Sequence, residues 1–120
     1  MTVGTKVLLV SPCRFTEQIQ SQLQSLGCEL LYAENGLRFI SHLDVEDPDV
    51  VIMDARPVWC DLHVLCRTVT SSRPSKPVFV LAHEESEYGA CENIGSAQVF
   101  HMPRQMSQLV RKVRQFSRAL

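Results

Sequence analysis

The sequence predicts an α/β fold in which helices cover both faces of a parallel sheet. Two short uninterrupted apolar runs, 7–10 and 50–53, have the composition of strands buried on both faces, and residues 78–82 form a third such run. Segments with apolar residues at helical spacing lie between these runs. Strands that alternate with helices form right-handed crossovers, and the crossovers make the sheet parallel.

The length of 120 residues and the apolar content of 45% predict a single domain over residues 1–120, with a core that needs neither disulfides nor metal. No apolar stretch reaches the roughly 20 residues of a membrane-spanning helix, and the amino terminus lacks the layout of a signal peptide. The 5 cysteines are an odd number and are scattered, which favours free thiols in a reducing compartment. We therefore expect a cytoplasmic protein.

The first strand is expected at 6–10, followed by a helix over 14–26 with apolar residues at helical spacing. Gly27 is placed to end that helix. A shorter strand at 29–33 is expected near an edge of the sheet. Asn35 then offers an N-cap for a second helix.

The central strand is the run from 50 to 53, which begins cleanly after Pro48 and ends in the carboxylate of Asp54. A loop follows, and Asp61 can cap the third helix. The fourth strand is expected at 77–82.

A weak fourth helix is expected over 84–94, interrupted by Gly89 and ended by Gly95. The fifth strand is expected at 97–101. The last helix is expected from 105 to the end, with a buried stripe of Met106, Leu109, Val110, Val113 and Phe116.

Five strand–helix units in a chain of this length point to the flavodoxin-like (βα)5 doubly wound sheet with strand order 2-1-3-4-5. Its switch point lies between the first and third strands. Ser11 and Pro12 follow the first strand, and Asp54 ends the third. Since ligands bind at the carboxyl ends of such strands, Asp54 is the first candidate functional residue.

Several segments have the order and spacing of one known family: the runs 6–10, 49–54 and 77–81, Gly95, and the Met102–Pro103 pair. In these segments the sequence resembles the response-regulator receiver domain (CheY-like), the phosphoacceptor module of bacterial two-component signalling. The resemblance covers nearly the whole chain. It implies that Asp54 is the phosphoacceptor equivalent and that the peptide bond before Pro103 is cis.

The resemblance also implies further phosphotransfer groups, and this sequence lacks them. The acidic pair that holds Mg²⁺ in the family would fall on Ser11 and Pro12. The phosphate-binding hydroxyl would fall on Ala82 and the phosphate-pairing lysine on Met102. The aromatic switch residue of the fifth strand would fall on Val99. Only the phosphoacceptor carboxylate is retained.

These losses predict a degenerate pseudo-receiver. Phosphoryl transfer depends on positioning and on charge neutralisation by Mg²⁺ and a cation, and Asp54 would hold the metal nearly alone. No cofactor is therefore expected, and Mg²⁺ binding should be lost or weak. The expected function is non-catalytic signalling through protein–protein contacts, independent of phosphorylation, on an attached or partner output domain such as a transcription regulator. The chain would then be a receiver-like domain, either free-standing or at the amino terminus of a longer regulator.

Other roles for Asp54 stay open at this stage. It can be phosphorylated by a histidine kinase in a two-component system, which is the main alternative. It can also be a strand-end carboxylate that accepts hydrogen bonds from nearby backbone amides. A third role is recognition of a ligand or partner.

The last helix is basic, because no Asp or Glu occurs from Asn93 to Leu120. Its basic side chains form either a solvated face or a protein interface. The resemblance implies contacts, including a homodimer, through the fourth helix, fifth strand and fifth helix. The net charge of −1 argues against nucleic acid. The candidate interface residues are Arg111, Lys112, Arg114 and Arg118.

Cys60, His63 and Cys66, with His83 at the same edge, are potential ligands for a soft metal or parts of a redox site. Structural zinc sites show paired Cys-x₂-Cys or His-x₃-His spacing, which is absent here, so no metal site is expected.

Cys13 and Trp59 are two further candidate residues near Asp54. Cys13 begins the first expected helix, where the helix dipole could lower the pKa of its thiol. No catalytic partner accompanies it, and no enzymatic activity is expected. Trp59 either covers the core or occupies the cleft together with Met102.

Overall fold

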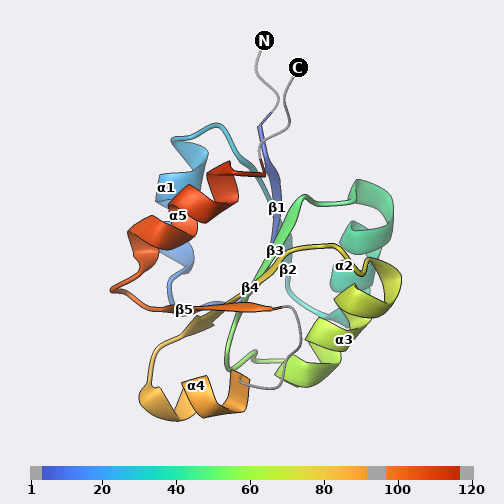
Figure 1. Ribbon diagram of the computed structural model, residues 1–120. Coiled ribbons are helices and arrows are strands. Elements are labelled where there is room, and N and C mark those ends of the chain that lie inside the picture. Colours follow the sequence, from blue (N-terminus) through green and yellow to red (C-terminus); the bar gives the residue numbers. More distant parts are fainter. Residues whose placement is uncertain (1–3, 92–96, 117–120) are drawn as a thin grey trace.

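The computed structural model describes residues 4–91 and 97–116, and these form a five-stranded parallel sheet in the order β2-β1-β3-β4-β5. The order and the parallel pairing confirm the predicted flavodoxin-like arrangement. Figure 1 shows α1 and α5 on one side of the sheet, with α2 and α3 on the other. The strands are β1 (Lys6–Val10), β2 (Glu29–Ala33), β3 (Val50–Asp54), β4 (Val78–Ala82) and β5 (Gln98–His101).

The helices follow the strands as the sequence predicts, with shorter bounds. They are α1 (Thr16–Gln24), α2 (Gly36–Ser41), a π-helical turn η1 (His42–Glu46), α3 (Leu62–Ser72), α4 (Glu85–Cys91) and α5 (Met106–Arg114). Within the described residues, no helix is both long and apolar enough to cross a membrane.

Hydrophobic side chains pack on both faces of the sheet. Every residue of β3 and β4 is buried, which is why their sequences are uninterrupted apolar runs. One core contains Ile19 and Leu23 of α1 packed with Leu109 and Val113 of α5. The other core lies beneath α2, α3 and α4.

Local signals in the sequence explain most element boundaries. Asn35 Oδ1 accepts a hydrogen bond from Arg38 N at 2.9 Å, and Asp61 accepts from the first turn of α3. Gly27 adopts φ +80°, the left-handed conformation that ends a helix cheaply only at glycine. The Met102–Pro103 peptide is cis, as the resemblance implies, and so is Ser11–Pro12.

The structure corrects the predicted first and fourth helices and adds a π turn after α2. The first helix begins at Thr16 rather than residue 14, because the Thr16 hydroxyl hydrogen-bonds the backbone of Cys13 and closes a turn there. The helix after Asn35 continues as the π turn η1. Gly89 does not interrupt α4, since it lies inside the helix. The predicted end at Gly95 and the last residues of the final helix lie outside the described residues.

Candidate functional site

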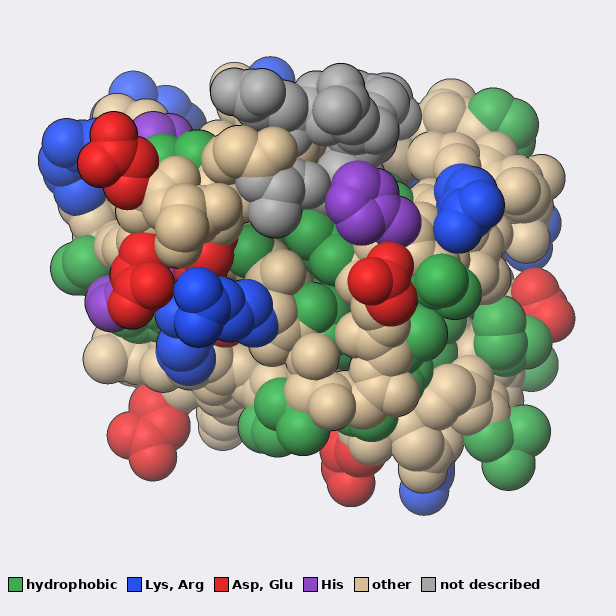
Figure 2. All heavy atoms as spheres, turned by 90° about the horizontal axis from the view of Figure 1, so that it is seen from below, with side chains coloured by type: hydrophobic (Ala, Val, Ile, Leu, Met, Phe, Trp, Pro, Cys, Tyr) green, Lys and Arg blue, Asp and Glu red, His purple; other side chains and the backbone are tan. Residues whose placement is uncertain are grey.

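The candidate site lies at the carboxyl ends of β1, β3 and β4, around Asp54. The Asp54 side chain is 2% exposed and lies at the base of a hollow of about 440 Å³. Figure 2, a view onto the lower end of the molecule in Figure 1, shows acidic and basic side chains side by side on one part of this face. The hollow is lined by Pro12, Cys13, Arg14, Asp54, Arg56 and Val58.

The guanidinium of Arg14, from the loop between β1 and α1, binds the Asp54 carboxylate through two parallel contacts. Arg14 Nη2 lies 2.6 Å from Oδ1, and Arg14 Nε lies 2.9 Å from Oδ2. Two backbone amides also donate to Asp54. Arg14 N lies 3.3 Å from Oδ2, and Arg56 N lies 2.9 Å from Oδ1. A carboxylate offers about four acceptor positions, so the acceptor capacity of Asp54 is filled by the chain itself.

Glu87 of α4 is the second buried carboxylate of the site, with a side chain that is 2% exposed. Its Oε1 accepts from Arg14 Nη2 at 2.9 Å and from the amides of His83 and Glu84 at 2.6 and 3.3 Å. Its Oε2 lies 2.9 Å from Arg56 Nε, an ion-pair contact that is not an aligned hydrogen bond. One Arg14 nitrogen therefore bridges two buried carboxylates.

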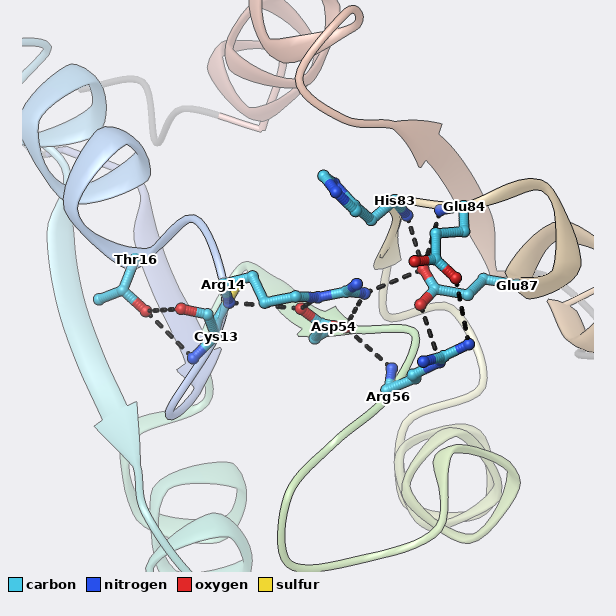
Figure 3. Close-up of polar contacts among 8 residues, drawn as sticks. All are labelled: Cys13, Arg14, Thr16, Asp54, Arg56, His83, Glu84 and Glu87. Carbon is cyan, nitrogen blue, oxygen red and sulfur yellow. Dashed lines mark hydrogen bonds and ion pairs between the residues drawn. The ribbon is translucent and has the colours of Figure 1, made fainter.

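Opposite charges alternate through this cluster, as Figure 3 shows. The order is Asp54, Arg14, Glu87, Arg56 and Glu84, and the last contact, Arg56 Nη2 to Glu84 Oε2, is 3.4 Å. That outer pair is more than half exposed, so solvent screens it and it contributes little. The inner contacts join the end of β3, the β1–α1 loop and the start of α4. We call Asp54, Arg14 and Glu87 the charged triad; its two carboxylates are buried and its arginine is partly exposed.

The contacts between Arg14 and Glu87 favour the charged form of each of these two side chains. Burial opposes ionisation of Glu87, but the hydrogen bonds from Arg14, His83 N and Glu84 N outweigh it and lower the pKa of that carboxyl to about 2. Hydrogen bonds to Asp54 and Glu87 raise the pKa of Arg14 above its ordinary value. Glu87 and Arg14 are therefore both charged at neutral pH.

The turn before α1 directs Arg14 toward the pocket. Cys13 N donates to Thr16 Oγ1 at 3.1 Å, and the Thr16 hydroxyl donates to Cys13 O at 2.7 Å.

The hypothesis of a lowered thiol pKa at Cys13 is wrong. Burial raises the pKa of this thiol, with Asp54 adding to the effect, and Cys13 lies before the helix rather than in it.

The sequence predicts a lone carboxylate at Asp54, and this is wrong because Arg14 binds it. Backbone amides also bind Asp54, as one of the open alternatives proposed. A signal for Arg14 was present: it is the first cationic residue after the strand that ends beside Asp54. Glu87 and Arg56 are harder to recognise in the sequence as site residues, because surface loops commonly carry charged residues.

The other predicted site positions contribute no polar side-chain contact to Asp54. Ser11 uses its backbone oxygen to accept from Trp59 Nε1 at 2.8 Å, and Pro12 lines the hollow. Ala82 and Met102 are buried in the two cores, and Val99 is half-buried beneath the α2–α4 side.

Trp59 covers the core and does not fill the cleft. Its ring packs edge-on against Phe39 at a centroid distance of 6.1 Å. The cleft beside Asp54, one of the two predicted positions of Trp59 and Met102, holds the guanidinium of Arg14.

The residues considered for a metal do not assemble into a site. Cys66 is buried with its sulfur 3.7 Å from that of Met53, and burial raises the pKa of its thiol to about 11. In the part of the chain that the structure describes, no three His, Cys, Asp or Glu side chains are grouped to hold a metal ion.

The geometry around Asp54 does not fit Mg²⁺ either. This ion is usually bound by one or two carboxylates together with water and phosphate oxygens. Ser11 and Pro12 offer no carboxylate, and the oxygens of Asp54 already accept from Arg14 and two amides.

Comparisons with known proteins identify the fold. No protein-family profile and no curated protein sequence matches the chain. Solved structures do match, at identities that establish the fold alone. The chain therefore has the fold of response-regulator receiver domains.

A receiver domain of a Francisella response regulator superposes with a TM-score of 0.76 at 19% identity, covering 93% of this chain and 95% of that one. The receiver domain of a Pseudomonas aeruginosa sensor histidine kinase, which holds magnesium in its active-site cleft, gives 0.79 at 19% identity, covering 94% and 97%. Brucella abortus NtrX gives 0.77 at 13% identity, covering 92% of this chain and 27% of NtrX.

A double-mutant cycle tests the Arg14–Asp54 pair. Arg14→Ala leaves Asp54 and Glu87 without the cation that they share, and Asp54→Ala removes the bidentate partner of Arg14, which keeps only Glu87. Each variant should lower the free energy of unfolding by about 2 kcal/mol, below the fully buried value because Arg14 is partly exposed. The double variant should lose much less than the sum. Urea denaturation measures all three variants. Arg67→Ala is the matched control, since Arg67 is exposed on α3 and takes part in no ion pair of the described residues; it should cost under about 0.5 kcal/mol. Additive effects of Arg14→Ala and Asp54→Ala would contradict the pairing.

The pKa of Glu87 predicts a specific acid sensitivity. Its folded-state pKa is lowered from 4.5 to about 2, so its ionised form stabilises the fold above pH 4.5 and this contribution disappears as pH falls through about 2. The stability difference between wild type and Glu87→Gln should shrink by roughly 2–3 kcal/mol over that interval. Urea unfolding at a series of pH values measures it, and parallel pH profiles for the two proteins would refute the assignment.

Proposed function

We propose that this chain is a pseudo-receiver: a non-catalytic signalling domain that works through protein contacts and does not use phosphorylation of Asp54. The observation that carries the proposal is the saturation of the Asp54 carboxylate by Arg14 and two backbone amides. In a phosphorylated receiver, a carboxylate oxygen must attack phosphorus while a metal and a cation neutralise charge. Here both oxygens already accept hydrogen bonds.

A phosphoryl group on Asp54 would also meet an unfavourable electrostatic environment. The phosphoaspartate would carry a charge of about −2 at neutral pH, where the carboxylate carries one negative charge. The second carboxylate of the triad, Glu87, shares Arg14 with Asp54 and would be left facing that group. Like charges in a buried site disfavour each other, so Glu87 supports the proposal independently of the lost magnesium ligands.

The same triad supports a fixed conformation. Arg14 connects the β1–α1 loop to Glu87 of α4, and α4 adjoins β5 through the stacked rings of Tyr88 and His101, whose centroids are 3.7 Å apart. The ion pair between Arg14 and Glu87 holds α4 against the β1–α1 loop in one position. Val99, at the aromatic-switch position, offers no ring that could change rotamer with the state of the pocket.

The α4–β5–α5 surface is the proposed site of protein contact. Arg104, Arg111 and Arg114 are exposed there and Lys112 is half-buried, while Arg118 lies outside the described residues. Arginine is favoured at interfaces, and a cationic surface fits a partner with acidic side chains. The partner is proposed to be an output domain, attached or separate, of which a transcription regulator is one kind; a second copy at this surface is the other form of the contact.

The alternative function is a receiver phosphorylated on Asp54 by a histidine kinase. One observation favours it: the Arg14 side chain is 35% exposed and can leave the pocket without disrupting the core. Such a protein would take up phosphate once Arg14 moved away.

Treatment with beryllofluoride or a small phosphodonor at millimolar Mg²⁺ distinguishes the two functions. The pseudo-receiver should gain no phosphoryl mass and should show no change in the amide spectrum around Asp54, because the acceptor oxygens are occupied. Arg14→Ala tests whether Arg14 alone blocks the reaction, and Asp54→Asn is the control for reaction at other sites. A phosphoryl adduct on the wild type that Asp54→Asn abolishes would establish the alternative.

A further inference from the structure

The outer side of α2 and η1 carries aliphatic side chains that no described part of the chain covers. Leu37 is 83% exposed and Val45 is 76% exposed, with Ile40 between them at 43%. Phe39 and Leu43 of the same segment are buried in the core. Isolated exposed aliphatic residues need no explanation, but these gather on one short helical segment, which is typical of an interaction surface.

The exposed residues are arranged symmetrically about Ser41. Leu37 and Val45 lie four positions before and after it, and Arg38 and Asp44 lie three positions before and after it. All five residues are exposed. Phe39 and Leu43 of the same segment are buried, so the exposed residues lie on the side away from the core, in α2 and in the π turn alike. They form a single face with an apolar and a charged residue at each end.

We propose that this α2 face, made of Leu37, Arg38, Ile40, Ser41, Asp44 and Val45, binds the same face of a second copy of the chain. A two-fold axis near Ser41 makes the two helices antiparallel. The Leu37–Arg38 end of one copy then lies beside the Asp44–Val45 end of the other. Each end of the contact pairs aliphatic with aliphatic and a cation with an anion, as a self-complementary two-fold interface requires.

The charges favour a second copy over an unrelated partner. A uniformly acidic or basic partner would face repulsion from either Asp44 or Arg38. Neither side chain takes part in an ion pair elsewhere in the described chain, so both are available. The π turn is a second observation: such turns are rare and occur frequently at functional sites, and this one has Leu43 inside while Val45 points out.

The position of the α2 face is compatible with the proposed partner surface. Figure 1 shows α2 across the sheet from α5, so a dimer through α2 leaves the basic surface of α5 accessible. One short helical segment buries less than the roughly 1,200 Å² of a standard stable interface, so the dimer should be weak and reversible. The dimer does not depend on whether Asp54 is phosphorylated.

Sedimentation velocity of the whole chain over a concentration series, up to about 1 mM, tests this inference. The wild type should show a concentration-dependent equilibrium between monomer and dimer. Leu37→Asp should weaken dimerisation at least about tenfold, because it places charge in the apolar contact. Arg38→Asp and Asp44→Arg should each weaken it by roughly fivefold, and the combined charge exchange should restore it, because the opposite charges meet again.

Leu26→Asp is the matched control, since Leu26 is also exposed, at 40%, but follows α1 on the other side of the sheet. It should dimerise like the wild type, and thermal melts verify that each variant is folded. A wild type that stays monomeric overturns the inference, as does a dimer insensitive to Leu37→Asp. A dimer that Arg111→Glu abolishes while Leu37→Asp spares it would place the contact on α5. None of these results bears on the phosphodonor experiment.

Discussion

The ion pair between Arg14 and Asp54 is the interaction on which the rest of the site depends. Asp54 is forced into its position because it ends the fully buried strand β3, and a buried carboxylate must find partners. Arg14 provides them from the neighbouring loop at 2.6 and 2.9 Å. With Arg14 in place, Glu87 can also be buried, because the guanidinium groups of Arg14 and Arg56 each lie 2.9 Å from one of its oxygens.

The charged cluster around Asp54 favours one conformation of the site more than it adds to the free energy of unfolding. Burying charges costs solvation free energy that their mutual attraction often only matches, so a buried ion pair adds little net stability while its disruption is expensive. The cost of disruption gives the triad its structural effect, since any movement of α4 away from the β1–α1 loop would separate Glu87 from Arg14. A receiver fold built this way has one favoured arrangement of α4. Our proposed function follows from that constraint.

The sequence predicted the fold well because its strongest signals are local and periodic. The apolar runs of β3 and β4, the Asn35 and Asp61 caps and the Gly27 turn each report a structure formed within a few residues. The boundaries it missed depend on other contacts. Thr16 closes the turn before α1, and the π turn after Ser41 has no simple sequence signature.

The site was predicted in position but not in content. Asp54 could be located because a carboxylate at the end of a buried strand is conspicuous. Its partners could not, because Arg14 and Glu87 are separated by 73 residues and meet only through the folded chain. The sequence shows that Asp54 lacks the acidic pair, hydroxyl and lysine of the receiver family. The absence of these groups does not indicate which cation, here Arg14, binds Asp54 instead.

The most direct measurement of the central claim is nitrogen-15 NMR of the Arg14 guanidinium at neutral pH. A bidentate pair with a buried carboxylate hinders rotation about the guanidinium bonds, so we predict two resolved Nη signals for Arg14. Their exchange should be faster in Asp54→Ala, where only the contact of Nη2 with Glu87 is left. A single averaged Nη signal in the wild type, as for an arginine free in solvent, would contradict the account.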